Sequence, residues 1–186
     1  ELLLKNQKIE EAHAYLSQYT QPLNQAPTHL IILHAQAFAL MDQYQDAYEY
    51  FNELTRRYPN DISYRFSAGL LAYENHQYSS AYPHFQQAVK LNPDSHSAYY
   101  YLGLSALGEN REEQALKYLR LVTKGPDRLN AITRVLDIEN PNESKIADYF
   151  HQLRHQHPDI SADIFGLEAH YLQKRGNLEG AARSYQ

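Results

Sequence analysis

Apolar residues recur along this chain with the period of an α-helix. Near the middle, Tyr78, Ala81, Phe85 and Ala88 follow one another at spacings of three, four and three residues. Side chains at these spacings lie on one face of a helix. Pro93 comes soon after them, and proline is a typical signal for the end of a helix. The pattern therefore predicts an amphipathic helix that ends before Pro93.

The same marks return every 34 residues on both sides of this helix. A period of this length is typical of stacked helical repeats. We predict three consecutive repeats, over 28–61, 62–95 and 96–129. The recurring positions are Ala35, Gly69 and Gly103; Ala47, Ala81 and Ala115; Phe51, Phe85 and Leu119; and Pro59 and Pro93.

The repeated small residues indicate how the two helices of one repeat pack. Antiparallel helices approach closely only where side chains are small, as at Gly69 with Ala81 and at Gly103 with Ala115. A large residue such as Phe85 then fills the space beside the crossing. Since neither helix hides its apolar face alone, each pair must stack on its neighbours, and a solenoid is expected.

With this period and these marks the chain resembles the tetratricopeptide repeat (TPR) family. The resemblance implies an all-α fold, a right-handed α-solenoid of antiparallel helix pairs. The richness in Gln, Asn, Tyr and His is similar to that of bacterial TPR proteins. Repeat 62–95 carries the family residues Gly69, Tyr78, Ala81, Phe85, Ala88 and Pro93, and repeat 96–129 carries Tyr99, Leu102, Gly103, Ala106, Ala115 and Leu119.

The remaining segments are interpreted as incomplete copies in one solenoid over 1–186. Residues 1–25 are a partial N-terminal repeat, and 130–161 are a degenerate repeat because Arg134 replaces the small residue at the helix crossing. Residues 162–186 are a truncated repeat, and we expect the full protein to continue beyond them. The marks of this last repeat are Ala169, Leu172, Gly176, Leu178, Ala181 and Tyr185.

Two of the predicted helices carry irregularities. Pro83 lies inside the second helix of repeat 62–95, so this helix is expected to begin late, near Ser79 or Ser80. In repeat 96–129, Gly125 and Pro126 are expected to end a helix over 111–124. The other predicted helices cover 7–20, which should pack on 28–40, and 29–41, 44–57, 96–108 and 144–155.

Composition excludes several classes of function. The chain has 186 residues, 21% of them charged, and a net charge of −5 without long runs of one sign, so nucleic acid is not an expected partner. The absence of cysteine excludes disulfides and thiolate metal sites and leaves the compartment open. No apolar run reaches membrane-spanning length. The first residue is not Met, which indicates processing or a fragment.

The resemblance also implies where a partner would bind. In the family, five positions of each first helix (helix A) line a concave groove. Exposed aromatic residues there are costly unless something covers them, so we predict a peptide-binding surface. The alternative is that these side chains pack between neighbouring A helices. The family positions are occupied by His29, Ile32, Gln36, Ala39, Leu40, Ser63, Phe66, Leu70, Tyr73, Glu74, Ser97, Tyr100, Leu104, Leu107 and Gly108. The candidate site, called the helix-A row below, comprises Ile32, Gln36, Phe66, Leu70, Tyr73, Tyr100 and Leu104.

Other kinds of site are not favoured. The carboxylate clamp of chaperone-linked relatives needs Asn and Lys or Arg at positions that here hold Leu33, Ser67, Tyr101, Leu40, Glu74 and Gly108. His151, His155 and His157 have spacings that could grip zinc, but in the HQLRH segment Gln152 cannot serve as a general base, and solvent-exposed histidines are favoured. Arg120, Lys124 and Arg128 indicate either a solvated helix face or a surface that steers an acidic partner.

No catalytic residue, metal or cofactor is expected, because no phosphate-binding loop, nucleophile elbow or dinucleotide motif occurs. The favoured hypothesis is a protein-interaction scaffold that binds a peptide or helix of a partner. Segment 165–185 of the chain resembles segments of envelope lipoproteins that serve as adaptors for periplasmic proteases or assembly machines. The compartment is thus expected to be the bacterial envelope, with the cytoplasm as alternative. The two other hypotheses are a substrate-recruiting region of a larger enzyme or regulator, and a stack that self-associates through its C-terminal end.

Overall fold

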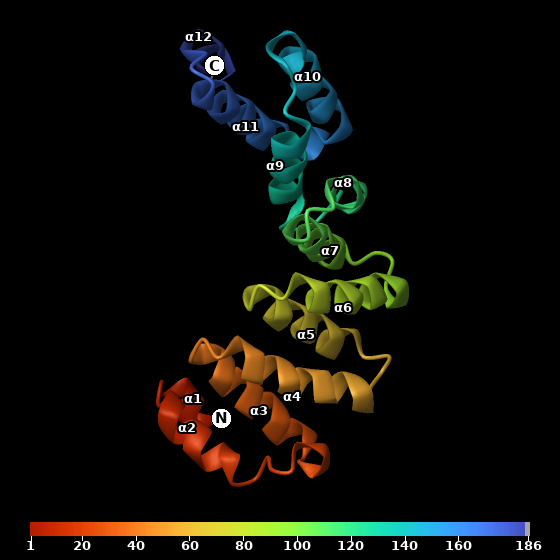
Figure 1. Cartoon of the computed structure of the whole chain (residues 1–186). Coiled ribbons are helices and arrows are strands. Elements are labelled where there is room, and N and C mark those ends of the chain that lie inside the picture. Colours follow the sequence, from red (N-terminus) through yellow and green to blue (C-terminus); the bar gives the residue numbers. More distant parts are fainter. Residues whose placement is uncertain (185–186) are drawn as a thin grey trace. The chain divides into compact units, whose positions relative to one another are not determined.

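The computed structural model describes residues 1–184 and divides the chain into two compact units, Glu1–Tyr118 and Leu119–Gln186. Within the described residues all regular structure is helical, as expected (Figure 1). In each unit, most helices pack on a helix that is next to them in the sequence. The expected class, an α-solenoid of paired helices, is therefore confirmed. Tyr185, a predicted mark of the last repeat, lies outside the described residues.

The first unit consists of helices that contact one another in chain order, α2 with α3, α3 with α4, and so on to α7. The contact of α2 with α3 confirms the expected packing of the N-terminal helix. The helices are α1 (Leu2–Lys5), α2 (Ile9–Ser17), α3 (Thr28–Leu40), α4 (Tyr44–Arg57), α5 (Ile62–Glu74), α6 (Tyr78–Leu91), α7 (His96–Gly108) and α8 (Glu112–Leu119), with a 3₁₀ turn, η1 (Leu23–Gln25), before α3.

The turn within each helix pair has one recurring geometry. Asp42, His76 and Asn110 all have positive φ, near +60°, and they stand 34 residues apart. After each of them an amide closes the turn; for example, Gln77 N donates to the Ala72 carbonyl over 2.8 Å. This pattern ends a helix with a left-handed residue and satisfies its last carbonyls. Asp and Asn visit the left-handed region more readily than most residues other than glycine.

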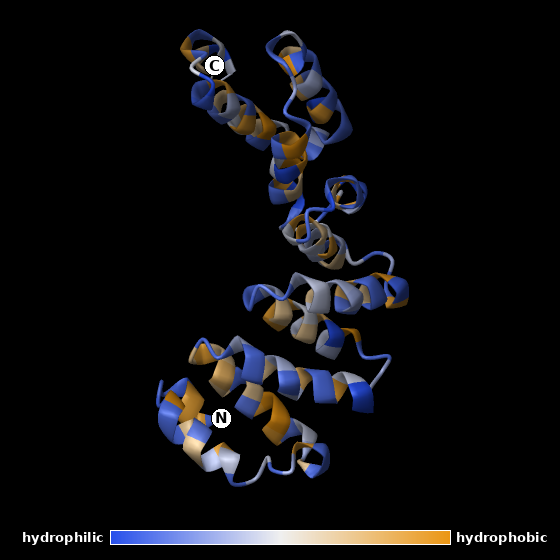
Figure 2. Ribbon diagram, in the orientation of Figure 1, coloured by the Kyte–Doolittle hydropathy of each residue, from blue (hydrophilic) through white to orange (hydrophobic). Residues whose placement is uncertain are grey.

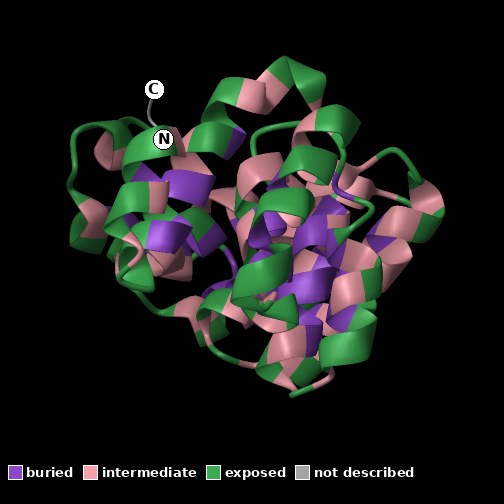
Figure 3. Ribbon diagram, turned by 90° about the horizontal axis from the view of Figure 1, so that it is seen from above, coloured by how far each residue is buried: buried purple, intermediate pink, exposed green. Residues whose placement is uncertain are grey.

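The first helix of a repeat (helix A) and its second helix (helix B) differ in composition because their surroundings differ. Figure 2 shows more hydrophobic residues on α3 than on α4. A first helix such as α3 or α5 lies between neighbours, whereas a second helix keeps one face in water. Figure 3 shows buried and exposed positions side by side along the same helices. The cores of this unit centre on Ala26, Ile31, Ala35, Tyr50 and Leu54, and on Ala72, Ala81, Phe85 and Leu102.

The predicted close crossing of α5 and α6 is confirmed at Gly69. A Cβ atom placed on Gly69 would lie 2.9 Å from the Phe85 ring and 3.2 Å from Cβ of His84. Ala81 and Phe85 are both fully buried. The small residue therefore allows the close approach, and the large one fills the adjacent space.

The expected late start of α6 was wrong. The helix begins at Tyr78 and includes Pro83 in its interior. Pro83 cannot donate to the Ser79 carbonyl, but both residues are exposed, so water can hydrate that carbonyl. The turn at His76 and the fully buried Ala81 fix the start of the helix despite the proline.

The second unit is built around a core contributed by four helices. Its regular elements are α9 (Arg128–Glu139), η2 (Glu143–Lys145), α10 (Ile146–Gln156), η3 (Pro158–Ile160), α11 (Ser161–Lys174) and α12 (Leu178–Ser184). Its core comprises Leu136, Ile146, Phe150, Ile164, Tyr171, Leu172 and Ala181.

Helix α8 is shorter than expected, because it ends at Leu119 instead of continuing to residue 124. The next residues include β-branched Val122 and Thr123, which have low helix propensity, and Gly125 has a φ of +84°. Val122 is only 2% exposed. The chain therefore leaves the helix after Leu119 and buries Val122 in a non-helical segment, instead of extending α8 by another turn.

Candidate functional site

The N-terminal part of the helix-A row borders a surface pocket of about 590 Å³. Ile32 and Gln36 lie on α3, one turn apart, and both line this pocket together with His29 and Leu33. Gln36 is exposed and Ile32 is half-buried. Residues Glu1, Leu4 and Lys5 form the opposite side. The pocket is thus an accessible hollow with an apolar floor at positions where the family resemblance implies partner contacts.

The middle of the row lies on α5, where Phe66, Leu70 and Tyr73 are half-buried. The Phe66 ring packs edge-on against Phe85 and Tyr101, with centroids 5.5 Å and 5.7 Å apart. The Tyr73 ring packs edge-on against Tyr101 at 5.7 Å. These side chains therefore pack between helices, as the alternative interpretation of the row expected, and they also keep a partly accessible edge.

The end of the row on α7 is enclosed. Tyr100 is 8% exposed and Leu104 is 9% exposed. Helix α7 is apolar around much of its circumference, since Ala98, Leu102 and Ala106 are also buried. Tyr100 and Leu104 therefore offer little surface to a partner, and the accessible part of the row comprises the residues of α3 and α5.

A buried polar network lies behind the α3 end of the row. Thr20 Oγ1 lies 2.7 Å from His34 Nδ1, and His34 Nε2 lies 2.9 Å from His13 Nδ1. Thr20 also lies 3.3 Å from the Tyr50 hydroxyl. Burial, aided by repulsion from His13, lowers the pKa of His34 to about 4. His34 is therefore neutral at physiological pH, and the network joins α2, α3 and α4.

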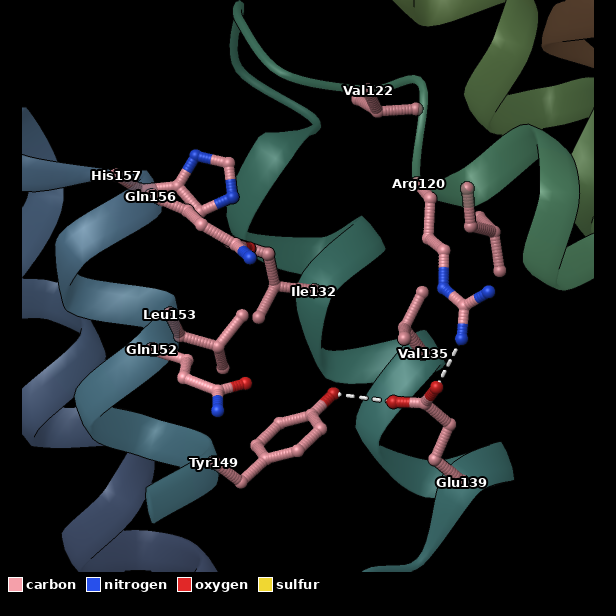
Figure 4. Close-up of a pocket in the computed structure, with 11 residues that line it drawn as sticks. Arg120, Val122, Ile132, Val135, Glu139, Tyr149, Gln152, Leu153, Gln156 and His157 are labelled. Carbon is pink, nitrogen blue, oxygen red and sulfur yellow. Dashed lines mark hydrogen bonds and ion pairs between the residues drawn. The ribbon is translucent and has the colours of Figure 1, made fainter. Parts of the chain in front are cut away.

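A second pocket, of about 340 Å³, lies within the second unit between α9 and α10 (Figure 4). Its floor is apolar and consists of buried or half-buried side chains. Arg120, Glu139, Tyr149 and His157 form polar walls, and Gln152 and Gln156 stand on α10. The floor residues are Leu119, Val122, Ile132, Val135 and Leu153.

The polar walls of this pocket are paired internally. The Arg120 guanidinium donates to Glu139 Oε1, and the Tyr149 hydroxyl donates to Glu139 Oε2 over 2.7 Å. Burial, followed by the bond to Glu139, raises the pKa of Tyr149. Burial, with repulsion from Arg128, lowers the pKa of His157. At neutral pH the walls thus hold one cation and one anion in contact, next to two neutral groups.

Sequence reasoning missed this pocket. Arg134, predicted at the helix crossing, is exposed and lies 4.0 Å from the Asp137 carboxylate. The residues of α9 that face α10 across the pocket are Ile132, Val135 and Glu139. Their size keeps the two helices from the close approach that glycine allows in repeat 62–95. The sequence signal for this pocket was the absence of a small residue at the helix crossing of repeat 130–161.

The basic residues following α8 do not share a helix face. Because α8 ends at Leu119, Arg120, Lys124 and Arg128 lie on different local structures. Arg120 pairs with Glu139, and Arg128 makes two contacts with Asp159, the shorter 2.7 Å. The interpretation of these residues as one solvated or steering helix face is therefore wrong.

Neither a metal-binding cluster nor a membrane-spanning helix occurs among residues 1–184. That range contains no cluster of three His, Asp or Glu residues able to hold a metal ion. His151 and His155 are exposed on α10, and His157 follows the helix. In the same range, no helix combines the length and apolar character that crossing a membrane requires.

The fold is similar to solved TPR structures. A double mutant of MamA RS-1 is 20% identical, with a TM-score of 0.67 over 84% of this chain and 89% of that one. MamA from Desulfovibrio magneticus RS-1 is 18% identical, with a TM-score of 0.56 over 98% and 85%. YrrB, described as a TPR protein with an unusual peptide-binding site, is 18% identical, with a TM-score of 0.56 over 91% and 88%. At these identities the likeness shows the fold alone.

Sequence comparison identifies the repeats directly. No curated protein sequence matches the chain significantly. Two family models described as tetratricopeptide repeat match residues 32–61 and 66–128, which together make up half of the chain. The matched ranges contain the recurring turn residues Asp42, His76 and Asn110. The chain therefore belongs to the tetratricopeptide repeat family.

Proposed function

We propose that this chain is a non-catalytic adaptor that binds a peptide segment of a partner protein on the accessible part of the helix-A row. The observation that carries the proposal is the pocket of about 590 Å³ beside α3. Its volume falls within the range of ligand-binding pockets, roughly 300–1,000 Å³. His29, Ile32 and Gln36, all at family partner-contact positions, line it.

The chemistry of the row suits a peptide. Ile32 and Leu33 provide apolar contact, and the amide of exposed Gln36 can donate to and accept from a peptide backbone. Phe66 and Tyr73 add partly accessible aromatic edges, which give large contact area at low cost in side-chain entropy. The peptide-binding site attributed to YrrB supports this assignment by fold analogy.

The test is a selection of displayed random peptides against the whole chain. Selected peptides are then measured against Ile32→Asp and Gln36→Glu, with exposed Lys90→Glu as a control that changes charge on another helix. Binding should be lost with Ile32→Asp, weakened with Gln36→Glu and retained with Lys90→Glu. Tyr100→Glu is not informative, because it would place a charge at a buried position. Selected peptides that bind both row variants as tightly as the parent chain would contradict the proposal.

We further propose that the adaptor works in the bacterial envelope, in the periplasm, beside a protease or an assembly machine. The similarity of segment 165–185 to envelope lipoprotein adaptors supports this location. Fractionation of the source organism, with an antibody against the chain, tests it. Recovery of the protein only with cytoplasmic markers would exclude the envelope.

A further inference from the structure

The pocket between α9 and α10 has two polar groups that the fold leaves unused. Gln152 and Gln156 stand four residues apart on α10, and both side chains extend from α10 toward α9 (Figure 4). Among the described residues, neither side-chain amide has a hydrogen-bond partner, and both residues are exposed. Each amide offers two donors and one acceptor oxygen beside the apolar floor.

The spacing of the two glutamines matches an extended polypeptide. Residues four apart on a helix are separated by about 6 Å along its axis. Alternate residues of an extended chain are separated by about 6.6 Å. Two such amides can therefore pair with the backbone groups of residues i and i+2 of a peptide that runs along α10. A side chain between these two residues would point toward the floor formed by Ile132, Val135 and Leu153.

The charged groups on the walls of this pocket favour a peptide side chain that is uncharged. The Arg120 guanidinium and the Tyr149 hydroxyl are both already bonded to Glu139. His157 is half-buried on the rim, close to Arg128, which itself pairs with Asp159. A carboxylate or ammonium group on the floor would thus lose water without gaining a free counter-ion.

We propose that this pocket is a second peptide-binding site, which takes an extended segment with one apolar anchor side chain of leucine or phenylalanine size. The Gln152 and Gln156 amides bind the peptide backbone, and the floor residues bind the anchor. A pocket of about 340 Å³ accommodates one such side chain with adjoining backbone. The site lies wholly within Leu119–Gln186 and does not depend on the helix-A row.

The test uses peptides selected from a displayed random heptapeptide library by the whole chain. The variants are Gln152→Ala and Gln156→Ala, and the matched control is Gln173→Ala, an exposed glutamine of α11 away from the pocket. We expect a peptide class with one apolar anchor whose Kd rises about tenfold with each pocket variant, which corresponds to a loss of about 1.4 kcal/mol in hydrogen bonding. The control should leave the Kd unchanged, and Leu→Glu in the peptide should abolish binding.

A second readout locates the peptide. Addition of a selected peptide should shift the side-chain amide resonances of Gln152 and Gln156, identified by their absence in the alanine variants. The proposal is overturned if no selected peptide responds to either variant, or if the affected resonances belong only to α3 and α5. The latter result would leave the proposed function intact. Self-association that disappears with Gln152→Ala would also overturn it, because the occupant would then be a second copy of the chain.

Discussion

His34 Nε2 lies 2.9 Å from His13 Nδ1, so a hydrogen bond between two imidazole rings joins helices α2 and α3. His34 is 1% exposed. The Thr20 hydroxyl donates to the Leu16 carbonyl over 3.0 Å and is therefore available to accept from His34 Nδ1. In that arrangement His34 Nε2 accepts from His13 Nδ1, and the His34 ring is neutral. A proton added to His34 would place a charge in this enclosed site.

This relationship predicts a loss of stability in mild acid. The pKa of His34 is about 4 in the folded chain and about 6.5 in the unfolded chain. Because the unfolded state binds the proton first, the contribution to stability is complete above pH 6.5. It falls by about 1 kcal/mol per pH unit between pH 6.5 and pH 4. Urea unfolding at pH 7.5 and at pH 5 measures this decrease.

The matched variant for this prediction is His34→Gln, which retains polar atoms but does not titrate. Buried His84 also has a pKa lowered to about 4, by burial and by Arg65, so it should keep part of the pH dependence. The decrease in stability between pH 7.5 and pH 5 should therefore be smaller in His34→Gln than in the parent chain. Equal decreases would show that His34 is not the titrating group.

Two glycines in helix interiors should respond oppositely to alanine. In Gly69→Ala the new methyl would lie 2.9 Å from the fully buried Phe85 ring. An overpacking cost of about 1–3 kcal/mol then outweighs the gain in helix propensity of about 1 kcal/mol. In Gly166→Ala nothing lies within 4 Å of the new methyl, so α11 should gain about 0.5–1 kcal/mol. Thermal unfolding of both variants checks the two signs, and stabilisation by Gly69→Ala would refute the crossing argument.

The regular half of the fold follows from sequence because each repeat carries the same local signals. The limits of α4 and α7 were predicted to the residue. Asp42, His76 and Asn110 adopt the left-handed turn where the family has glycine, so the turn geometry persists although its usual residue is absent. Pro83 shows that a local signal can predict the wrong start of a helix. Tertiary contacts of Ala81 set the start of α6, and an exposed proline does not overcome them.

The unpredicted features arise where the repeat loses its small residues. Periodicity places apolar residues on a helix face, but it does not give the distance between two helices. Ile132 and Val135 face α10 across an open pocket, whereas Gly69 lies against Phe85. The exposure of the helix-A row could not be predicted from the sequence either. Tyr100 and Leu104 occupy groove positions of their repeat, as accessible Gln36 does, yet both are buried. The binding role of this row stays a prediction.

Arg57 should hold the linker before α3 in place. Its guanidinium donates to the carbonyls of Ala26 and Leu23, over 2.7 Å and 2.5 Å, and its Nε lies 3.0 Å from Glu53. In Arg57→Met two carbonyls would lose a charged donor, at a cost of about 1–3 kcal/mol. Limited proteolysis should then cut residues 21–27 faster than in the parent chain. The matched variant Arg56→Met removes a more exposed arginine that also binds Glu53, and it should leave the cleavage rate unchanged.

The ion pair of Arg154 with Glu168 predicts a stability effect that depends on both residues. Arg154 Nη1 lies 2.5 Å from Glu168 Oε2, the two side chains are 18% and 10% exposed, and the guanidinium lies over the Phe165 ring at 4.1 Å. Arg154→Met leaves an enclosed carboxylate without its cation, so the free energy of unfolding should fall by about 2–4 kcal/mol.

The double variant Arg154→Met/Glu168→Met should recover most of this loss, because the uncompensated charge is gone. Arg134→Met, which removes an exposed partner of Asp137, should leave stability unchanged. Hydrogen exchange of α10 and α11 measures all three, and a double variant no more stable than Arg154→Met would show that the loss came from the aromatic contact instead of the unpaired carboxylate.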